Sequence, residues 1–171
     1  FPGVVSFISS RNFHFISLSK GEWCQLFCKY LWYFIEPDVQ SLIKKTVAAR
    51  EYAYSPYSKF KVGAGVLCID GTISTGCNIE NASYPVGVCA ERTAIVKAVS
   101  EGKRKFKVLA VVADKENDTF TTPCGLCRQT IAEFGDIPIY LVEPLMKSVL
   151  RTSLSKLLPG AFGLGNAEIL Q

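Results

Sequence analysis

Three cysteines and one glutamate are the residues of this chain best suited to carry out chemistry. Glu91 follows Cys89 by two positions, and Cys124 and Cys127 form a Cys-x-x-Cys pair further along the chain. Structural zinc sites usually take four protein ligands, whereas catalytic sites take three and leave one position for water. Three thiols beside a carboxylate that is not needed as a ligand therefore predict a catalytic zinc site, with Glu91 as the proton shuttle for the bound water.

Other interpretations of the same residues remain open. A closed four-cysteine site could use Cys68 or Cys77 as its fourth ligand, although cysteine in a strand commonly packs as a small buried hydrophobe. Glu91 could simply be an acidic residue that favours a helix N-terminus. The closed site leaves Glu91 without a role, so the open site is favoured. The lone histidine, His14, lies far from the motif, which disfavours histidine-based catalysis.

Both cysteine blocks are expected at the starts of helices, where free N–H groups and partial positive charge favour thiolate over thiol. Gly125 is expected to allow a tight turn between the paired cysteines. Three thiolates around Zn²⁺ form a negative cluster that opposes ionisation of a bound water. We expect Arg92 to offset this charge by donating hydrogen bonds to the ligand sulfurs, and Arg128 is also well placed. The alternative for Arg92 is an ordinary surface arginine.

The elements that must position these residues alternate between helix and strand after Pro37. Hydrophobic periodicity predicts helices over 39–52, 89–101, 125–134 and 153–158, with Gly102 and Gly135 ending the second and third. It predicts strands over 60–69, 73–78, 108–113 and 137–142, with a hairpin turn at Asp70-Gly71. This order predicts a three-layer α/β/α sandwich with an antiparallel opening hairpin and parallel later strands.

Length and composition indicate a globular protein with one catalytic domain at residues 37–171, preceded by an atypical aromatic-rich extension at 1–36. The net charge of +4 is mild, and the basic run at 103–107 is expected to be a solvated turn, so no nucleic-acid partner is expected. Residues 23–35 are apolar but contain Gln25 and Lys29 and fall short of the roughly 20 residues of a membrane span. An odd number of cysteines and no convincing signal peptide favour the cytoplasm.

The regular part of the chain, from Pro37 to Gly163, resembles the small, homotetrameric cytidine deaminases of the all-cysteine zinc type. The segments that carry the resemblance are SPYS at 55–58, FKVGA at 60–64, GCNIENA at 76–82, CAERTA at 89–94, PCGLCRQ at 123–129 and LLPGAFG at 157–163. Together they are highly specific. The resemblance implies a central mixed sheet of about five strands, zinc held by Cys89, Cys124 and Cys127, and proton transfer by Glu91.

The resemblance also implies a set of substrate contacts. Asn78 and Glu80 would hold the ribose hydroxyls, which suits an amide and a carboxylate. Phe60 would lie against the nucleoside, and the backbone of Ala90 would help to fix the pyrimidine edge. Without the resemblance, Phe60 would be interpreted as a core aromatic, and Asn78 and Glu80 as turn residues.

The function implied is zinc-dependent hydrolytic deamination of cytidine and deoxycytidine to uridine and deoxyuridine, with release of ammonia, as in pyrimidine salvage. Tyr84 and Phe162 would contribute to a neighbouring subunit's pocket in a homotetramer with shared active sites. One alternative is a deaminase of another cytosine nucleoside, such as a nucleoside antibiotic, against which the segment NIEN at 78–81 argues. The other alternative is a non-enzymatic zinc-binding module with a closed four-cysteine site.

Overall fold

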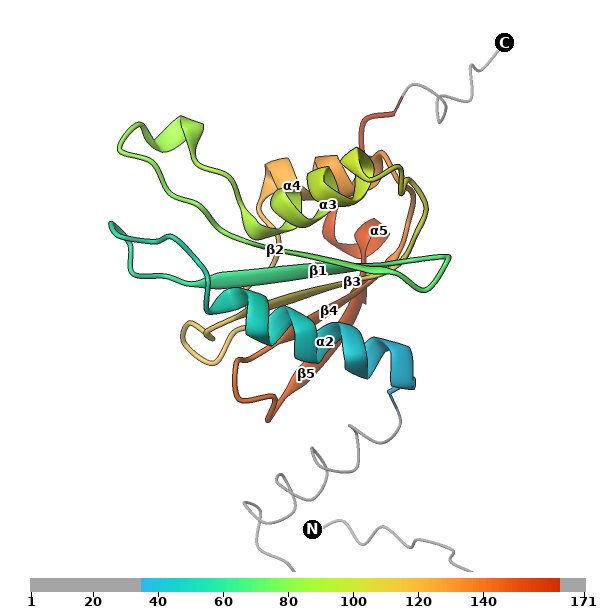
Figure 1. The fold of residues 1–171 in the computed structure, drawn as a ribbon, viewed down its shortest axis with the longest axis horizontal. Helices are drawn as coiled ribbons and strands as arrows, with labels where there is room; N and C mark the ends of the chain where they lie inside the picture. Colours follow the sequence, from blue (N-terminus) through green and yellow to red (C-terminus); the bar gives the residue numbers. More distant parts are fainter. Residues whose placement is uncertain (1–34, 164–171) are drawn as a thin grey trace, which may run out of the picture.

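A mixed sheet of five strands forms the centre of the computed structural model, which describes residues 35–163 (Figure 1). The strands are β1 (Val62–Cys68), β2 (Ile73–Cys77), β3 (Phe106–Ala113), β4 (Pro138–Val142) and β5 (Val149–Ser153), in the spatial order β2-β1-β3-β4-β5. The helices are α2 (Pro37–Arg50), α3 (Ala90–Ser100), α4 (Gly125–Ala132) and α5 (Leu154–Leu157), with a 3-10 turn, η1, at Tyr84–Val86. No helix in the described range is long and apolar enough to cross a membrane.

Strand directions agree with the helical connections expected from the sequence. β1 is antiparallel to both β2 and β3, so β2 and β3 run the same way with α3 between them in the chain. β3 and β4 pair in parallel across the α4 connection, and β5 returns antiparallel to β4. The mixed sheet is therefore confirmed.

Helices cover both faces of the sheet, which confirms the three-layer sandwich (Figure 1). On one face, Leu42 and Ile43 of α2 pack in a buried cluster with side chains of β1, β3 and β4. On the other face, α3, α4 and α5 share a second cluster, to which they contribute Ile95, Ile131 and Leu154 respectively. The starts of α3 and α4 therefore lie in the same layer, on the same side of the sheet.

A glycine in β2 brings α3 unusually close to the sheet. A Cβ atom built on Gly76 would lie 2.5 Å from the backbone nitrogen of Ala94 and 2.9 Å from the carbonyl oxygen of Ala90. Real Cβ atoms essentially never make contacts below 3.0 Å, so only glycine allows this separation. The distance between β2 and the first turns of α3 is thus set by the absence of a side chain at position 76.

Several boundaries differ from those predicted. The first strand begins at Val62 rather than at residue 60, because the Asn78 side chain replaces a partner strand there: its Oδ1 accepts from the Val62 N–H at 2.8 Å. β5 was not predicted, because this edge strand buries little of its surface and has no apolar alternation. Gly102 and Gly135 have positive φ angles of 81° and 101°, which confirms them as helix stops. The predicted extension at 1–36 lies, except for its last two residues, outside the described range.

Candidate active site

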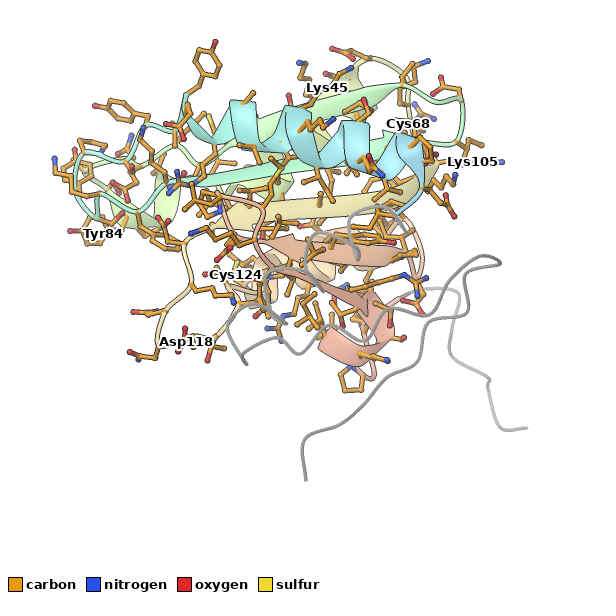
Figure 2. The ribbon with its side chains drawn as sticks, turned by 90° about the horizontal axis from the view of Figure 1, so that it is seen from below. Lys45, Cys68, Tyr84, Lys105, Asp118 and Cys124 are labelled. Atoms are coloured by element: carbon orange, nitrogen blue, oxygen red, sulfur yellow. The ribbon has the colours of Figure 1, made fainter. Side chains whose placement is uncertain are left out.

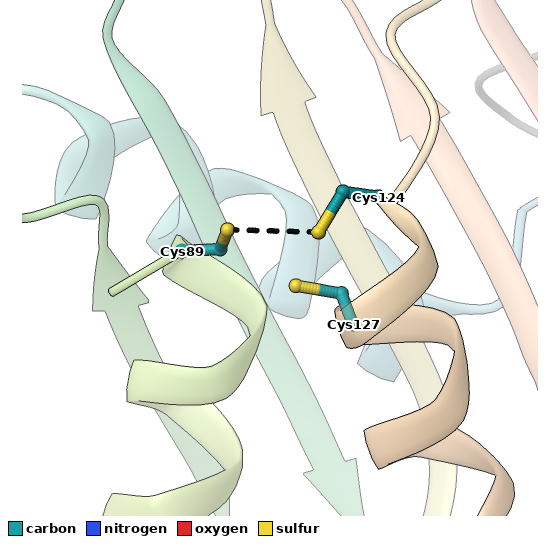
Figure 3. Close-up of side chains that lie close together, drawn as sticks. All are labelled: Cys89, Cys124 and Cys127. Atoms are coloured by element: carbon teal, nitrogen blue, oxygen red, sulfur yellow. Dashed lines mark hydrogen bonds between the residues drawn. The ribbon is translucent and has the colours of Figure 1, made fainter. Parts of the chain in front are cut away.

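Three thiols from two helix N-termini meet on one side of the sheet (Figure 3). Cys89 is the N-cap residue of α3, Cys124 is the N-cap residue of α4, and Cys127 lies in the first turn of α4. Neither N-cap cysteine makes a side-chain capping hydrogen bond, although N-cap positions normally favour serine, threonine, aspartate or asparagine for that purpose. These cysteines therefore contribute nothing to capping, and their sulfurs are free to bind a ligand.

The spacing of the sulfurs fits a zinc ion. The Sγ atoms of Cys89 and Cys124 lie 3.8 Å apart, and all three sulfurs lie within 4.8 Å of one another. Zn–S bonds of about 2.3 Å in a tetrahedral arrangement place two sulfurs about 3.8 Å apart. Within residues 35–163, this is the only group of at least three histidine, cysteine or acidic residues close enough to share a metal. Cys68 and Cys77 therefore do not supply a fourth ligand, and the closed-site alternative loses its support.

The pKa values of the Cys89 and Cys127 thiols are shifted in opposite directions. Interactions with Cys127, Cys124 and Arg92 lower the pKa of the Cys89 thiol to about 5. Burial acts in the opposite direction but is outweighed. The same contact with Cys89, together with burial, raises the pKa of the Cys127 thiol. The site therefore carries a thiolate at neutral pH before any metal is bound, and a thiolate is the form that zinc binds.

The two arginines considered beside the cysteines have different surroundings. Arg92 lies near Cys89, whose negative charge interacts favourably with its guanidinium group, and its Nη2 donates to the Gly87 carbonyl at 3.1 Å. The Arg92 Nε is buried and has no hydrogen-bond partner. Arg128 instead turns its guanidinium group toward backbone carbonyls, including that of Pro123 at 2.7 Å. Only Arg92 thus lies where its charge can act on the sulfurs.

Glu91 is the second residue of α3 and lies beside the thiols with only 4% of its surface exposed. Burial raises the pKa of its carboxyl group above the ordinary value, and the negative charge of Cys89 adds to this effect. A carboxyl group with a raised pKa holds a proton more readily than an ordinary glutamate does, as a group that accepts and returns protons must. Its position and burial fit the proton shuttle expected from the sequence.

Gly125 lies in the turn between the paired cysteines, as expected, but the turn does not depend on glycine. Its φ angle lies outside the left-handed region, and an added Cβ would meet no atom within 4 Å. The tight turn between Cys124 and Cys127 is an ordinary first turn of α4, which any residue with helical backbone angles can form. Glycine is therefore compatible with this turn but is not required for it.

A cavity of about 490 Å³ opens beside Cys89, a volume typical of small-molecule sites. Three of the residues implied by the resemblance, Asn78, Glu80 and Tyr84, line it together with Cys89. The other three do not line it: Ala90 is fully buried, Phe60 is partly exposed, and Phe162 is on the carboxyl-terminal segment with 75% of its surface exposed.

Two lining residues that sequence reasoning did not single out are Tyr57 and Ser58. The Ser58 hydroxyl and the N–H groups of Tyr57 and Ser58 all donate to the Glu80 carboxylate, the N–H bonds at 2.9 and 3.2 Å. The hydroxyl bond is the main cause that lowers the pKa of Glu80, so this carboxylate stays ionised. The Tyr57 ring lies edge-on to Tyr84, with 6.1 Å between centroids. The SPYS turn was the available signal, but only the fold shows which carboxylate it holds.

Asn78 is engaged by backbone on both sides of its amide. Its Oδ1 accepts from Val62, and its Nδ2 donates to the Phe60 carbonyl at 2.9 Å. These bonds fix the orientation of the Asn78 side chain at the cavity wall and tie it to the segment that carries Phe60.

The basic run at 103–107 lies at the other end of the molecule from Tyr84, as the labels of Lys105 and Tyr84 show in Figure 2.

Known proteins share both the sequence and the fold of this chain. The model of the cytidine and deoxycytidylate deaminase zinc-binding region matches residues 37–143. A cytidine deaminase of Sporosarcina psychrophila is 58% identical over 127 residues, which cover 73% of this chain and 91% of the relative. The crystal structure of cytidine deaminase from Burkholderia pseudomallei has a TM-score of 0.67 and 44% identity, and the match covers 71% of this chain and 97% of that chain.

A more distant relative is the blasticidin-S deaminase of Bacillus cereus, which is 31% identical over 108 residues that cover 60% of this chain and 76% of the relative. The matches at higher identity are to cytidine deaminases. The family model spans the three thiols and Glu91, the residues that the fold brings together. The chain therefore belongs to the zinc-binding family of cytidine and deoxycytidylate deaminases.

Proposed function

We propose that this protein converts cytidine and deoxycytidine to uridine and deoxyuridine by hydrolysis, with release of ammonia. The observation that carries the proposal is the open three-thiol site with a buried glutamate beside it, adjoining a cavity of about 490 Å³. A closed four-cysteine site has no open position for a water molecule or a substrate, whereas three thiols leave one position of the metal open.

The thiols of Cys89, Cys124 and Cys127 hold the zinc ion. When bound, zinc lowers the pKa of a water molecule and so supplies the nucleophile that the reaction needs. Arg92 offsets part of the negative charge of the sulfurs, which otherwise opposes the loss of a proton from that water. The favourable interaction of the Arg92 charge with the Cys89 thiolate supports this role.

Glu91 moves the protons of the reaction. Its carboxylate accepts a proton from the attacking water and passes it to N3 of the pyrimidine. It then takes the second proton, from the hydroxyl group formed at C4, and gives it to the amino group, which leaves as ammonia when the C4–N bond breaks. The raised pKa of Glu91 supports this cycle, because a strongly acidic carboxyl group returns protons poorly. Proton transfers of this kind typically contribute roughly 10²- to 10⁴-fold in rate.

The nucleoside is oriented by groups along the cavity wall. Glu80, kept ionised by Ser58, accepts hydrogen bonds from ribose hydroxyls, and Asn78 supports the same sugar. Phe60 packs against the nucleoside. The Ala90 N–H is the first of α3 and so has no partner within the helix, which leaves it available to the pyrimidine edge.

We further propose a homotetramer in which neighbouring subunits complete each site. Tyr84 and Phe162 are 76% and 75% exposed, although both rings are largely apolar. Tyr57, 49% exposed, extends the same aromatic rim as Tyr84. Exposed aromatic patches beside a substrate cavity are typical of surfaces that are covered by a partner.

Other parts of the proposal concern the setting of the enzyme. Residues 37–171 form the catalytic domain, which the start of the family match at residue 37 supports. The reaction recovers pyrimidine nucleosides for reuse, as in salvage. The cysteines in the described range are all free thiols, which supports a reducing compartment such as the cytoplasm.

Deamination of a cytosine nucleoside antibiotic is the second candidate, favoured by the identity to blasticidin-S deaminase. A competition assay with cytidine and blasticidin S separates the two. Faster turnover of cytidine supports the main proposal, and faster turnover of the antibiotic replaces it.

The direct test follows the ultraviolet absorbance of cytidine incubated with the zinc-loaded protein, with ammonia release as the check. Glu91→Gln should keep zinc and lose at least about 10²-fold in kcat, whereas Cys124→Ala should lose both zinc and activity. Glu101→Gln is the matched control, since Glu101 is an exposed residue at the opposite end of α3. Full activity in Glu91→Gln would reject the mechanism.

A further inference from the structure

The side chains of Arg128 and Gln129, which directly follow Cys127, form hydrogen bonds with residues 157–162, called here the carboxyl-terminal segment. The Arg128 Nη1 donates to the Leu157 carbonyl at 2.8 Å. The Gln129 amide makes two bonds to one residue: its Nε2 donates to the Phe162 carbonyl at 2.8 Å, and its Oε1 accepts from the Phe162 N–H at 3.3 Å. The segment is therefore held at two points five residues apart.

Arg128 also holds the chain on the other side of the metal site. Its Nε donates to the Pro123 carbonyl, and its Nη2 donates to the Thr122 hydroxyl at 2.9 Å. One guanidinium group thus joins the two residues that precede Cys124 to the last residue of α5. The planar fork of arginine can make these bonds at once, whereas the single ammonium of lysine cannot match that geometry.

The two hydrogen bonds between the Gln129 amide and the Phe162 backbone fix that backbone, but they do not hold the Phe162 ring. Phe162 exposes 75% of its surface, so the hydrophobic effect within this subunit does little to position its ring. The hydrogen bonds from Gln129 to the Phe162 backbone position this residue instead. Two of the three metal ligands, Cys124 and Cys127, and this anchor lie within six consecutive residues of α4 and its N-cap, so a single helical segment relates the position of Phe162 to that of two of the sulfurs.

We infer that Arg128 and Gln129 are positioning residues that hold the carboxyl-terminal segment in register with the metal site and so present the Phe162 ring for contact with nucleoside. The kinetic consequence rests on the proposed function, because it requires that Phe162 completes a nucleoside cavity. The clamp itself is a property of the fold and can be measured without substrate.

The first test measures hydrogen exchange of the Phe162 amide in the zinc-loaded full chain. Gln129→Met keeps a side chain of similar length and removes both bonds, so exchange at Phe162 should become at least tenfold faster than in the wild type. The control is Thr130→Val, which removes a bond from a hydroxyl to its own helix at the Leu126 carbonyl and leaves the segment untouched. Equal exchange rates in Gln129→Met and the wild type would overturn the clamp.

The second test is kinetic. Gln129→Met should raise KM for cytidine several-fold, with a smaller change in kcat and an unchanged zinc content. Phe162→Ala should do the same, and the double variant should be no worse than Phe162→Ala alone, because both changes remove one contact. Additive losses, or a loss of zinc in Gln129→Met, would overturn the positioning role.

Arg128→Lys separates position from charge. If Arg128 acts by holding the backbone, lysine fails to replace it and KM rises as in Gln129→Met. Wild-type kinetics in Arg128→Lys would show that charge alone matters and would overturn its part in the clamp. A wild-type protein that does not deaminate cytidine would refute the proposed function, while the exchange measurement would still decide whether the clamp exists.

Discussion

Gly76 offers a way to move the metal site without touching it. Gly76→Ala adds one methyl group in β2, on the side where α3 approaches. The three nearest atoms to that methyl group all belong to α3: the Ala94 nitrogen at 2.5 Å, the Thr93 Cβ at 2.7 Å and the Ala90 carbonyl oxygen at 2.9 Å. Two of the three are backbone atoms, so a side-chain rotation cannot relieve the overlap.

The size of the effect follows from these distances. The contact to Ala94 falls short of an ordinary 3.4 Å separation by 0.9 Å, so α3 must shift by roughly that amount or β2 must bend. Because α3 carries Cys89 at its N-cap and Glu91 in its first turn, a displacement of about 1 Å misaligns both and can cost about 10²-fold in kcat/KM. Overpacking of this kind costs about 1–3 kcal/mol of folding free energy.

The assay compares kcat/KM for cytidine, bound zinc and urea unfolding for Gly76→Ala and for Gly125→Ala. The second variant makes the same chemical change on α4, where the added methyl group meets nothing within 4 Å, and it should be neutral or stabilising by up to about 1 kcal/mol. Gly76→Ala with wild-type activity and stability would refute the argument that the closeness of α3 and β2 sets the site.

Three further predictions test the site directly. Ser58→Ala removes the main cause that lowers the pKa of Glu80, so the pH below which KM rises should increase toward 4.5, the ordinary pKa of glutamate. KM measured between pH 3.5 and 6 checks the direction, and an unshifted profile would contradict it. Arg92→Gln should weaken zinc retention during dialysis against a chelator and lower kcat, because the negative charge of the sulfurs is no longer offset; unchanged zinc and kcat would make Arg92 an ordinary arginine. Removal of zinc should abolish turnover and lower Tm, and adding zinc back should restore both; a Tm that does not respond to zinc would contradict coupling of metal binding to folding.

The metal site could be predicted from sequence because each part of it is local. Cys124 and Cys127 are three residues apart, which is about one helical turn, and Cys89 and Glu91 lie within a single turn of another helix. Hydrophobic periodicity likewise predicted the alternation of helices and strands, and from it the three-layer α/β/α arrangement. Only the meeting of the two helix starts required the resemblance or the fold.

The rest depended on contacts that sequence spacing does not reveal. β5 escaped prediction because an edge strand hydrogen-bonds on one side and buries little, so its sequence has no alternating pattern. Ser58 and Glu80 are 22 residues apart, and the loop geometry alone decides that they meet. Gly125 is the opposite case: a glycine between two ligands suggests a special backbone conformation, but the backbone there is that of an ordinary helix, which glycine allows and does not need.

The origin of the three sulfurs has a consequence for the order in which the chain assembles. Cys89 and Cys124 are 35 residues apart, and β3, the central strand of the sheet, lies between them in the sequence. A nascent chain that ends before residue 124 has one of the three ligands, and the full set forms only after β3 has been inserted beside β1. The complete three-thiol site is therefore a product of the folded sheet, and a chain with an incomplete sheet binds zinc more weakly than the folded domain.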